Sequence, residues 1–255
     1  LLRQALDLVV ARHEALRASF DLSGFSVPLQ LVHRTAHVPL VIADRRGTGA
    51  AGVAAHVAED MAEAGKPFDV GRAPLIRLHV TRIDDEDFQI TYGFHHAIMD
   101  GWSETVFSTE LFAAYDALLT GTSPDLGDPP AGHEDLFHHE RDVLASHQAR
   151  CFWRDRCAAL AGEPGPTDDG PRTGVRTRAS RVLPATVRAG LTRVAEASRV
   201  PLKSLLVAAH LVALRAVAAA PAPTTGLIVN CRPESTDGDR LVGMVSQRDL
   251  LQVDL

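Results

Sequence analysis

The segment FHHAIMDGWS, residues 94–103, places side chains capable of acid–base chemistry where an apolar strand is expected to end. His95 and His96 are adjacent, and Asp100 follows four residues after His96. Imidazole has an ordinary pKa near neutrality, so a histidine here can take a proton from an attacking amine or hydroxyl. Three interpretations are open: a general base beside a structural neighbour, a metal site, or two structural histidines.

The alternation of the preceding strand separates the two imidazoles. Adjacent side chains of an extended chain point to opposite faces, so His95 and His96 rarely bind the same metal ion. The inward face of the strand is that of Phe88, Ile90, Tyr92 and Phe94. If the same alternation continues, His96 lies on this face and His95 lies on the opposite one. A metal site at His96 and Asp100 needs at least one more ligand, and no spaced partner is evident.

Composition limits the function further. The chain has 255 residues, a net charge of −6 and an isoelectric point of about 6.0, which argues against a nucleic-acid-binding surface. Its 45% hydrophobic and 23% charged residues are ordinary for a globular protein. Three cysteines without CxxC spacing favour a reducing compartment and argue against a disulfide framework or a Cys-based zinc site.

Neither a membrane span nor a targeting segment is expected. The longest apolar stretch, residues 205–220, contains His210 and Arg215 and is too short to cross a bilayer. The first twenty residues carry Asp7 and Glu14 and have no cleavage site for a signal peptidase. We therefore expect a cytoplasmic protein that does not bind membranes. Because the chain begins in mid-helix without Met, we also expect a fragment that lacks its true N-terminus.

The periodicity predicts a mixed chain of the α+β type. It has no regular β-α-β rhythm and no glycine-rich phosphate loop, which disfavours a nucleotide-binding doubly wound sheet. A turn at 84–86 joins the two strands of a half-buried hairpin, and the Gly-, Pro- and Asp-rich stretch 162–174 is the best candidate linker. Helices are predicted at 1–19, 49–65, 102–121, 134–160, 184–198 and 201–219, and strands at 25–33, 38–44, 74–83, 87–94, 179–183 and 226–231.

Several stretches together resemble one enzyme family. HHAIMDGWS resembles the HHxxxDG signature of the condensation domains of nonribosomal peptide synthetases, members of the chloramphenicol acetyltransferase-like superfamily. RHEALRASF, residues 12–20, is similar to the family's RHExLRTxF motif and lies upstream, as in the family. CFWRDRCAAL (151–160) and GLIVNCRPE (226–234) resemble further family segments, the second with Cys231 where glycine is usual. The resemblance runs from residue 1 to about residue 245.

The family's late motif is matched only in part. Gly243 and Met244 fit a Gly-x-Phe-x-Asn-Thr run, whereas Val245 replaces its aromatic residue. Gln247 and Arg248 stand in place of the Asn-Thr pair. This departure slightly favours a degenerate domain that recruits partners without catalysis, while the intact HHxxxDG motif argues against one.

The resemblance implies an α/β fold with two chloramphenicol acetyltransferase-like lobes in a V and a tunnel between them. The N-terminal lobe with the HHxxxDG motif would be residues 1–165. Residues 175–255 would form a C-terminal lobe that is incomplete, since family members are considerably longer.

The resemblance also implies the reaction. Donor and acceptor peptidyl carrier proteins, with neighbouring synthetase domains as partners, would deliver substrates as thioesters on 4′-phosphopantetheine arms. The acceptor amine would attack the donor thioester and form an amide. The domain itself would bind no cofactor and no metal. The alternative is a related acyltransferase that forms an ester or uses a free acceptor.

Residue roles follow from the matched positions. His96, matching the second histidine of the motif, would orient or deprotonate the acceptor amine, and His95 would be structural. Asp100 resembles the family's structural aspartate, which pairs with an arginine. Arg232 and Arg17 are the candidates, and Arg232 is preferred because it lies on a turn after a core strand.

Three further positions complete the predicted site. Gly101 would let the backbone approach the reacting groups, since a Cβ there would crowd the tunnel. Trp102 would be a packing anchor. Arg12, together with Arg17, would brace the first helix.

A second histidine cluster, HEDLFHHE at residues 133–140, is interpreted without a metal. His138 and His139 are adjacent and cannot both face one ion from a helix. The segment reads as a solvated helix start with Leu136 and Phe137 as its inward residues.

Overall fold

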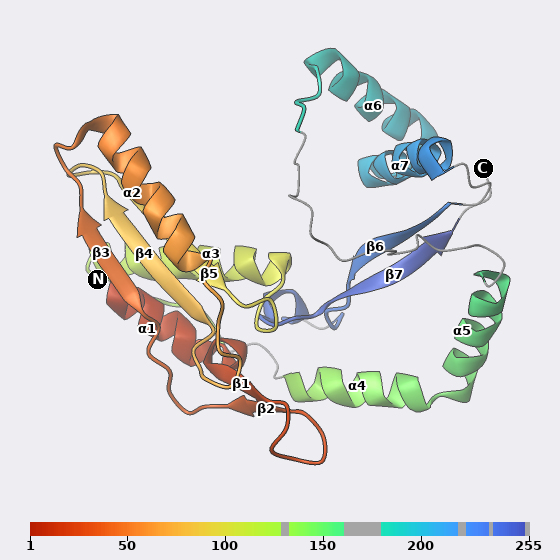
Figure 1. Ribbon diagram of the computed structural model, residues 1–255, viewed down its shortest axis with the longest axis horizontal. Helices are drawn as coiled ribbons and strands as arrows, with labels where there is room; N and C mark the ends of the chain where they lie inside the picture. Colours follow the sequence, from red (N-terminus) through yellow and green to blue (C-terminus); the bar gives the residue numbers. More distant parts are fainter. Residues whose placement is uncertain (129–132, 161–179, 219–222, 235–236, 253–255) are drawn as a thin grey trace. The chain divides into compact units, whose positions relative to one another are not determined.

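The computed structural model describes residues 1–128, 133–160, 180–218, 223–234 and 237–252 (Figure 1). The chain divides into two compact units, Leu1–Asp142 with Asn230–Ser246, and Val143–Val229 with Gln247–Leu255. The predicted boundary between residues 165 and 175 falls within 161–179, outside the described residues. The second unit is not one continuous piece, because residues 230–246, predicted to belong to the C-terminal lobe, pack with the first unit.

The N-terminal segment folds as helix α1 (Leu2–Arg12), 3-10 helix η1 (Glu14–Arg17) and strand β1 (Ala18–Asp21), which pairs antiparallel with β2 (Leu29–Val32). The single helix predicted over residues 1–19 is therefore wrong beyond Arg12. His13 has extended backbone, with φ −104° and ψ 116°, and its buried ring lies 2.7 Å from a carboxylate oxygen of Glu110. A tertiary contact thus ends the helix where the periodicity alone would continue it.

The main sheet of the first unit has the strand order β3 (Leu40–Asp44), β4 (Ile76–Arg82), β5 (Phe88–Phe94). Helix α2 (Gly49–Ala64) connects β3 to β4, which run parallel. β4 and β5 are antiparallel, which confirms the predicted hairpin. In its turn, Asp84 Oδ1 accepts hydrogen bonds from the N–H groups of Glu86 and Asp87.

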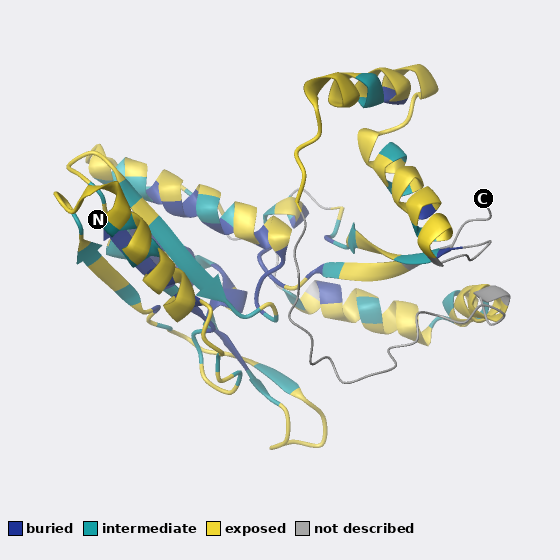
Figure 2. Cartoon of the chain, turned by 45° about the horizontal axis from the view of Figure 1, so that its top comes forward, coloured by how far each residue is buried: buried dark blue, intermediate teal, exposed yellow. Residues whose placement is uncertain are grey.

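The central strand β4 is buried on both faces. Leu78 is fully buried among core residues of α1 and α3 (Gly101–Leu119), and Thr81, on the opposite face, is fully buried as well. The second face is covered by α2, whose Asp60 accepts a 2.6 Å hydrogen bond from Thr81 Oγ1. The prediction of a half-buried sheet was wrong for β4 because it did not anticipate that α2 covers this face. Figure 2 shows the buried stripes of the helices in dark blue.

Between residues 133 and 160 the predicted single helix is two, α4 (His133–Ala145) and α5 (His147–Leu160), interrupted at Ser146. The second unit contains α5, α6 (Ala185–Ser198) and α7 (Leu202–Ala218), and the bounds of α6 and α7 are close to those predicted. Residues 180–183 are not a strand, contrary to prediction, and the rest of that segment lies outside the described residues. The predicted linker 162–174 also lies outside them.

Strand β6 (Thr224–Asn230) was predicted, and its partner β7 (Ser246–Gln252) was not. The loop between these strands contains a second 3-10 helix, η2 (Gly238–Arg240). Within the described part of the chain, no single helix has the length and apolarity to cross a membrane, and only the bent pair α6–α7 meets both criteria jointly.

Candidate active site

His95 lies in the turn that follows β5. Its backbone N–H donates a 2.9 Å hydrogen bond to Leu75 O, which continues the sheet pattern for one residue. Its ring nitrogen Nδ1 accepts a 3.2 Å hydrogen bond from the N–H of Ala97. Because this contact ties the imidazole to its own turn, the geometry supports the structural role predicted for His95.

His96 is exposed, and its ring centroid lies 6.4 Å from that of Phe94. The prediction that it faces inward with the alternating residues of β5 was wrong, because the strand ends at Phe94 and the chain turns there. The turn brings the ring to an open surface instead. An exposed imidazole is accessible to a substrate, which a core histidine would not be.

A pocket of about 540 Å³ adjoins the two histidines. The end of α2 and strand β5 form its walls, and Met61, Phe68, His95 and His96 are among its lining residues. β5 and α2 approach closely at Gly93, where a Cβ would lie only 1.9 Å from the carbonyl oxygen of Ala64. Glycine at this position therefore permits the close packing that shapes the pocket wall.

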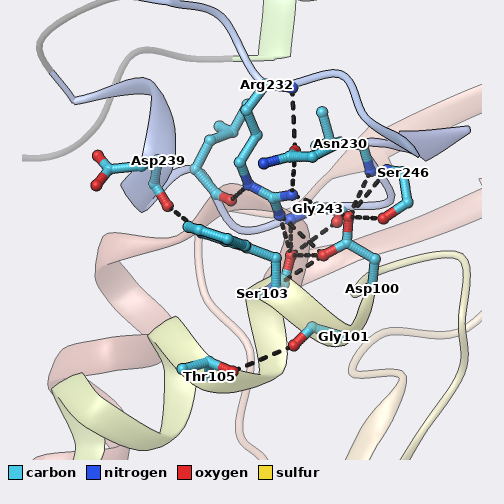
Figure 3. Close-up of polar contacts among 12 residues, drawn as sticks. Asp100, Gly101, Ser103, Thr105, Asn230, Arg232, Asp239, Gly243 and Ser246 are labelled. Atoms are coloured by element: carbon cyan, nitrogen blue, oxygen red, sulfur yellow. Dashed lines mark hydrogen bonds and ion pairs between the residues drawn. The ribbon is translucent and has the colours of Figure 1, made fainter. Parts of the chain in front are cut away.

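Asp100 and Arg232 form the buried ion pair that was predicted. Asp100 is 1% exposed, and its Oδ1 lies 2.8 Å from Arg232 Nη2. Arg232 Nη1 donates to Oδ2 at 3.1 Å, so the contact is bidentate (Figure 3). The alternative partner, Arg17, donates instead to backbone carbonyls of Val10, His33 and Arg34.

Other groups complete the coordination of the Asp100 carboxylate. Ser103 donates through its N–H and its hydroxyl, both at 2.8 Å, and Ser246 donates through its N–H at 2.9 Å and its hydroxyl at 2.6 Å. Burial raises the pKa of Asp100, but the hydrogen bonds from Arg232, Ser246 and Ser103 outweigh it and hold the pKa well below its usual range. Asp100 is therefore an ionised structural group rather than an acid or base.

Sequence reasoning missed Ser103 and Ser246. Asp100 is the N-cap of α3, and a capping aspartate accepts from an N–H two or three residues into its helix, which could have identified Ser103. Ser103 is fully buried; its hydroxyl oxygen accepts a 2.9 Å hydrogen bond from the N–H of Gly243 and lies 2.8 Å from Gly243 O. Ser246 is far away in sequence, and no local signal marks it.

Gly101 and Trp102 differ in how well they match expectation. A Cβ added to Gly101 would have no atom within 4 Å, so the crowding predicted there is not found. Trp102 is half-exposed, its indole N–H donates a 2.7 Å hydrogen bond to Asp239 O, and the Arg232 guanidinium lies 6.0 Å from its ring centroid. Trp102 thus anchors the β6–β7 loop through this hydrogen bond, but half of the residue is exposed, so it is less closely packed than predicted.

Arg12 braces its helix through three contacts. Its guanidinium donates to the carbonyl oxygens of Gly127 and Asp128, at 2.8 and 2.5 Å, and its Nε lies 3.2 Å from the carboxylate of Glu110. Arg17 braces the other end of the motif through its bonds to the backbone. Both arginines therefore make the supporting contacts that were expected of them.

The second histidine cluster is partly as expected. Leu136 is buried, whereas Phe137 is 49% exposed, so its predicted inward position is wrong. Among the described residues, no group of three or more His, Cys, Asp or Glu side chains is arranged to hold a metal ion.

Gly243 and His133 make a testable steric pair. A Cβ added to Gly243 would lie 2.1 Å from Nε2 of His133, closer than any real contact. We expect Gly243→Ala to lower the melting temperature by several degrees, as overpacking costs about 1–3 kcal/mol. Thermal unfolding of the purified variant measures this.

The matched control is the double variant Gly243→Ala with His133→Ala, which removes the clashing ring. The double variant is expected to be more stable than the sum of the two single changes predicts. Strict additivity would show that His133 does not occupy the space beside Gly243.

Comparison with known proteins identifies the family. The profile described as "Condensation domain" matches residues 1–246. The chain belongs to the condensation-domain family. The AMB antimetabolite synthetase AmbE of Pseudomonas aeruginosa is 36% identical over 254 residues, which cover 96% of this chain and 12% of AmbE. The phosphinothricin tripeptide synthetase PhsC of Streptomyces viridochromogenes is 31% identical over 207 residues, 77% of this chain and 19% of that protein.

Solved structures share the fold. The first condensation domain of the calcium-dependent antibiotic synthetase, in complex with a substrate analogue, matches with a TM-score of 0.81 at 23% identity. The match covers all of the present chain and 60% of the solved chain. The SgcC5 protein of Streptomyces globisporus gives a TM-score of 0.79 at 23% identity and is covered to 58%. The predicted chloramphenicol acetyltransferase-like fold is confirmed, with the chain spanning about three fifths of these structures.

Proposed function

We propose that this condensation domain forms an amide bond between two carrier-bound substrates. A donor acyl or peptidyl group and an acceptor aminoacyl group would both arrive as thioesters on the phosphopantetheine arms of carrier proteins. Its synthetase relatives and the matched motifs support this assignment.

The main observation is that the imidazole of His96 is exposed beside a pocket, four residues before Asp100, whose carboxylate is held by buried hydrogen bonds. The Asp100 carboxylate fixes the start of α3 and, through it, the turn 95–100 that bears the histidine. A fixed imidazole at an accessible surface is what proton transfer to or from a bound substrate requires. Asp100 with Arg232, Ser103 and Ser246, here called the Asp100 cluster, therefore positions His96 and takes no proton itself.

The role of His96 follows from the bonds that form and break in the reaction. The acceptor amine attacks the carbonyl carbon of the donor thioester, and a C–N bond forms to give a tetrahedral intermediate. His96 orients the amine and takes the proton that it loses. The C–S bond then breaks, and the departing thiolate of the donor arm receives a proton. The product is an amide on the acceptor arm and a free thiol on the donor arm.

The alternative is a related acyltransferase that forms an ester or acts on a free acceptor. It would use the same His96 and Asp100 geometry. Two features favour the carrier-bound reaction: the match to synthetase chains and the absence from the sequence of a glycine-rich phosphate loop that could clamp coenzyme A.

The expected result is that the acceptor reacts efficiently only when tethered. A donor-loaded carrier is mixed with the domain and with the acceptor amine, either free or on a second carrier, and products are measured by mass spectrometry. Tethering raises the effective concentration of the amine at the site, so the carrier-bound acceptor should react at least about a hundredfold faster at equal concentration. Equal turnover with the free amine would support the alternative.

A further inference from the structure

Within the first unit, the β6–β7 loop is attached to α3 and its neighbours at two separate places. The first is the Asp100 cluster, where Arg232 and Ser246 come from this loop and from the start of β7. The second lies about three turns further along α3, at Glu110. The side chain of Glu110 is only 8% exposed, so its charge needs partners.

Glu110 gathers three basic side chains. Its Oε2 lies 2.7 Å from His13 Nε2 and 3.2 Å from Arg12 Nε, both at the end of α1. Its Oε1 lies 3.1 Å from Nη2 of Arg240, in the loop. Arg240 donates in addition to the carbonyl oxygen of Leu126. One carboxylate thus joins α1, α3 and the β6–β7 loop.

The charge state of Glu110 suits a residue that attaches the β6–β7 loop through ion pairs. Burial raises the pKa of this carboxyl, but the hydrogen bond to His13 and the nearby guanidinium groups of Arg12 and Arg240 more than offset that effect and lower it. Glu110 is therefore ionised at neutral pH. Between the two anchors, Trp102 holds Asp239 O, so the loop is attached along much of its length.

We propose that Glu110 is a positioning residue for the condensation reaction. Through Arg240 it fixes the loop that presents Arg232 to Asp100, and so it acts on the turn that bears His96 from a second point. This inference rests on the proposed function. The proposed role of Glu110 is separate from that of the Asp100–Arg232 pair, because the contacts of Glu110 are to His13, Arg12 and Arg240.

The test compares Glu110→Gln with the unchanged chain in two measurements. The amide keeps the shape of the side chain and removes its charge, which weakens the hydrogen bonds to His13 and Arg240 and the ion pair with Arg12. We expect hydrogen–deuterium exchange of residues 237–245 to rise by about tenfold or more, which is the effect of one lost charged hydrogen bond. We expect kcat for amide formation, per folded molecule, to fall by about tenfold with KM for the carriers little changed.

Arg240 supplies the conservative comparison. Arg240→Gln should raise the exchange and lower kcat as Glu110→Gln does. Arg240→Lys keeps the charge and should change both quantities less than Arg240→Gln. The double variant Glu110→Gln with Arg240→Gln should differ little from either single variant. Arg46→Gln, at an exposed ion-pair cluster with Asp44 and Asp85, is the matched control and should change neither measurement.

The outcomes separate the two claims. Unchanged exchange in Glu110→Gln overturns the anchor. Raised exchange with unchanged kcat overturns the positioning role and leaves a merely structural one. If the unchanged chain forms no amide at all, the proposed function and the catalytic part of this inference both fail, and exchange alone decides the anchor.

Discussion

Replacing His96 with alanine is expected to reduce amide formation by about a hundredfold to ten-thousandfold, the usual contribution of a general acid–base group. The exposed ring contacts Phe94 at a centroid distance of 6.4 Å and contributes little buried area, so its loss should leave the fold intact. Single-turnover rates with loaded carriers, together with a thermal unfolding curve, measure both effects.

His95→Ala is the matched comparison, since it removes the same side chain one position earlier. Its ring accepts a hydrogen bond from Ala97 within the turn. We expect a lower melting temperature and only a modest loss of rate. If His95→Ala lost as much activity as His96→Ala without any loss of stability, the division of roles between the two histidines would be wrong.

Replacing Asp100 with alanine is expected to cost about 3–5 kcal/mol of stability, because Arg232 would be left buried and unpaired. The change also removes the cap of α3 and the acceptor for Ser103 and Ser246. Urea unfolding followed by circular dichroism measures the loss. Asp116→Ala, an exposed aspartate on the same helix, is the control and should change stability by less than about 0.5 kcal/mol.

The stability difference should depend on pH. The folded-state pKa of Asp100 is depressed, so its contribution is present above the ordinary value of about 3.9 and is lost as pH falls toward the folded-state value. The gap between the unchanged protein and Asp100→Ala should therefore be constant near neutrality and narrow below about pH 4. A gap that persisted undiminished in strong acid would show that charge at Asp100 is not its cause.

Local patterns in the sequence predicted most of the elements near the site. The hairpin of β4 and β5, the helix after Asp100 and the pairing of Asp100 with Arg232 were all anticipated, the pairing from the family motif. These features depend on alternation, helix capping and short motifs, which are encoded within a few residues. Contacts between distant segments were harder to anticipate.

The features that the sequence analysis predicted wrongly or missed share a physical cause. His13 ends α1 because its ring meets Glu110, 97 residues away, and β4 is buried on both faces because α2 packs on the second. His96 is exposed because a turn replaces the strand at residue 95, which strict alternation cannot foresee. Ser246 and Arg240 join the first unit through tertiary bonds that leave no periodic signal.

The central claim is that this domain transfers an acyl group from one carrier arm to an amine on another by using His96. The most direct test is the intact mass of the acceptor carrier after a single turnover with donor-loaded carrier. With the unchanged domain, the acceptor carrier should gain the mass of the donor acyl group while the donor carrier loses it, and His96→Ala should leave both masses nearly unchanged over the same time. No gain with the unchanged domain, or an equal gain with His96→Ala, would contradict the account.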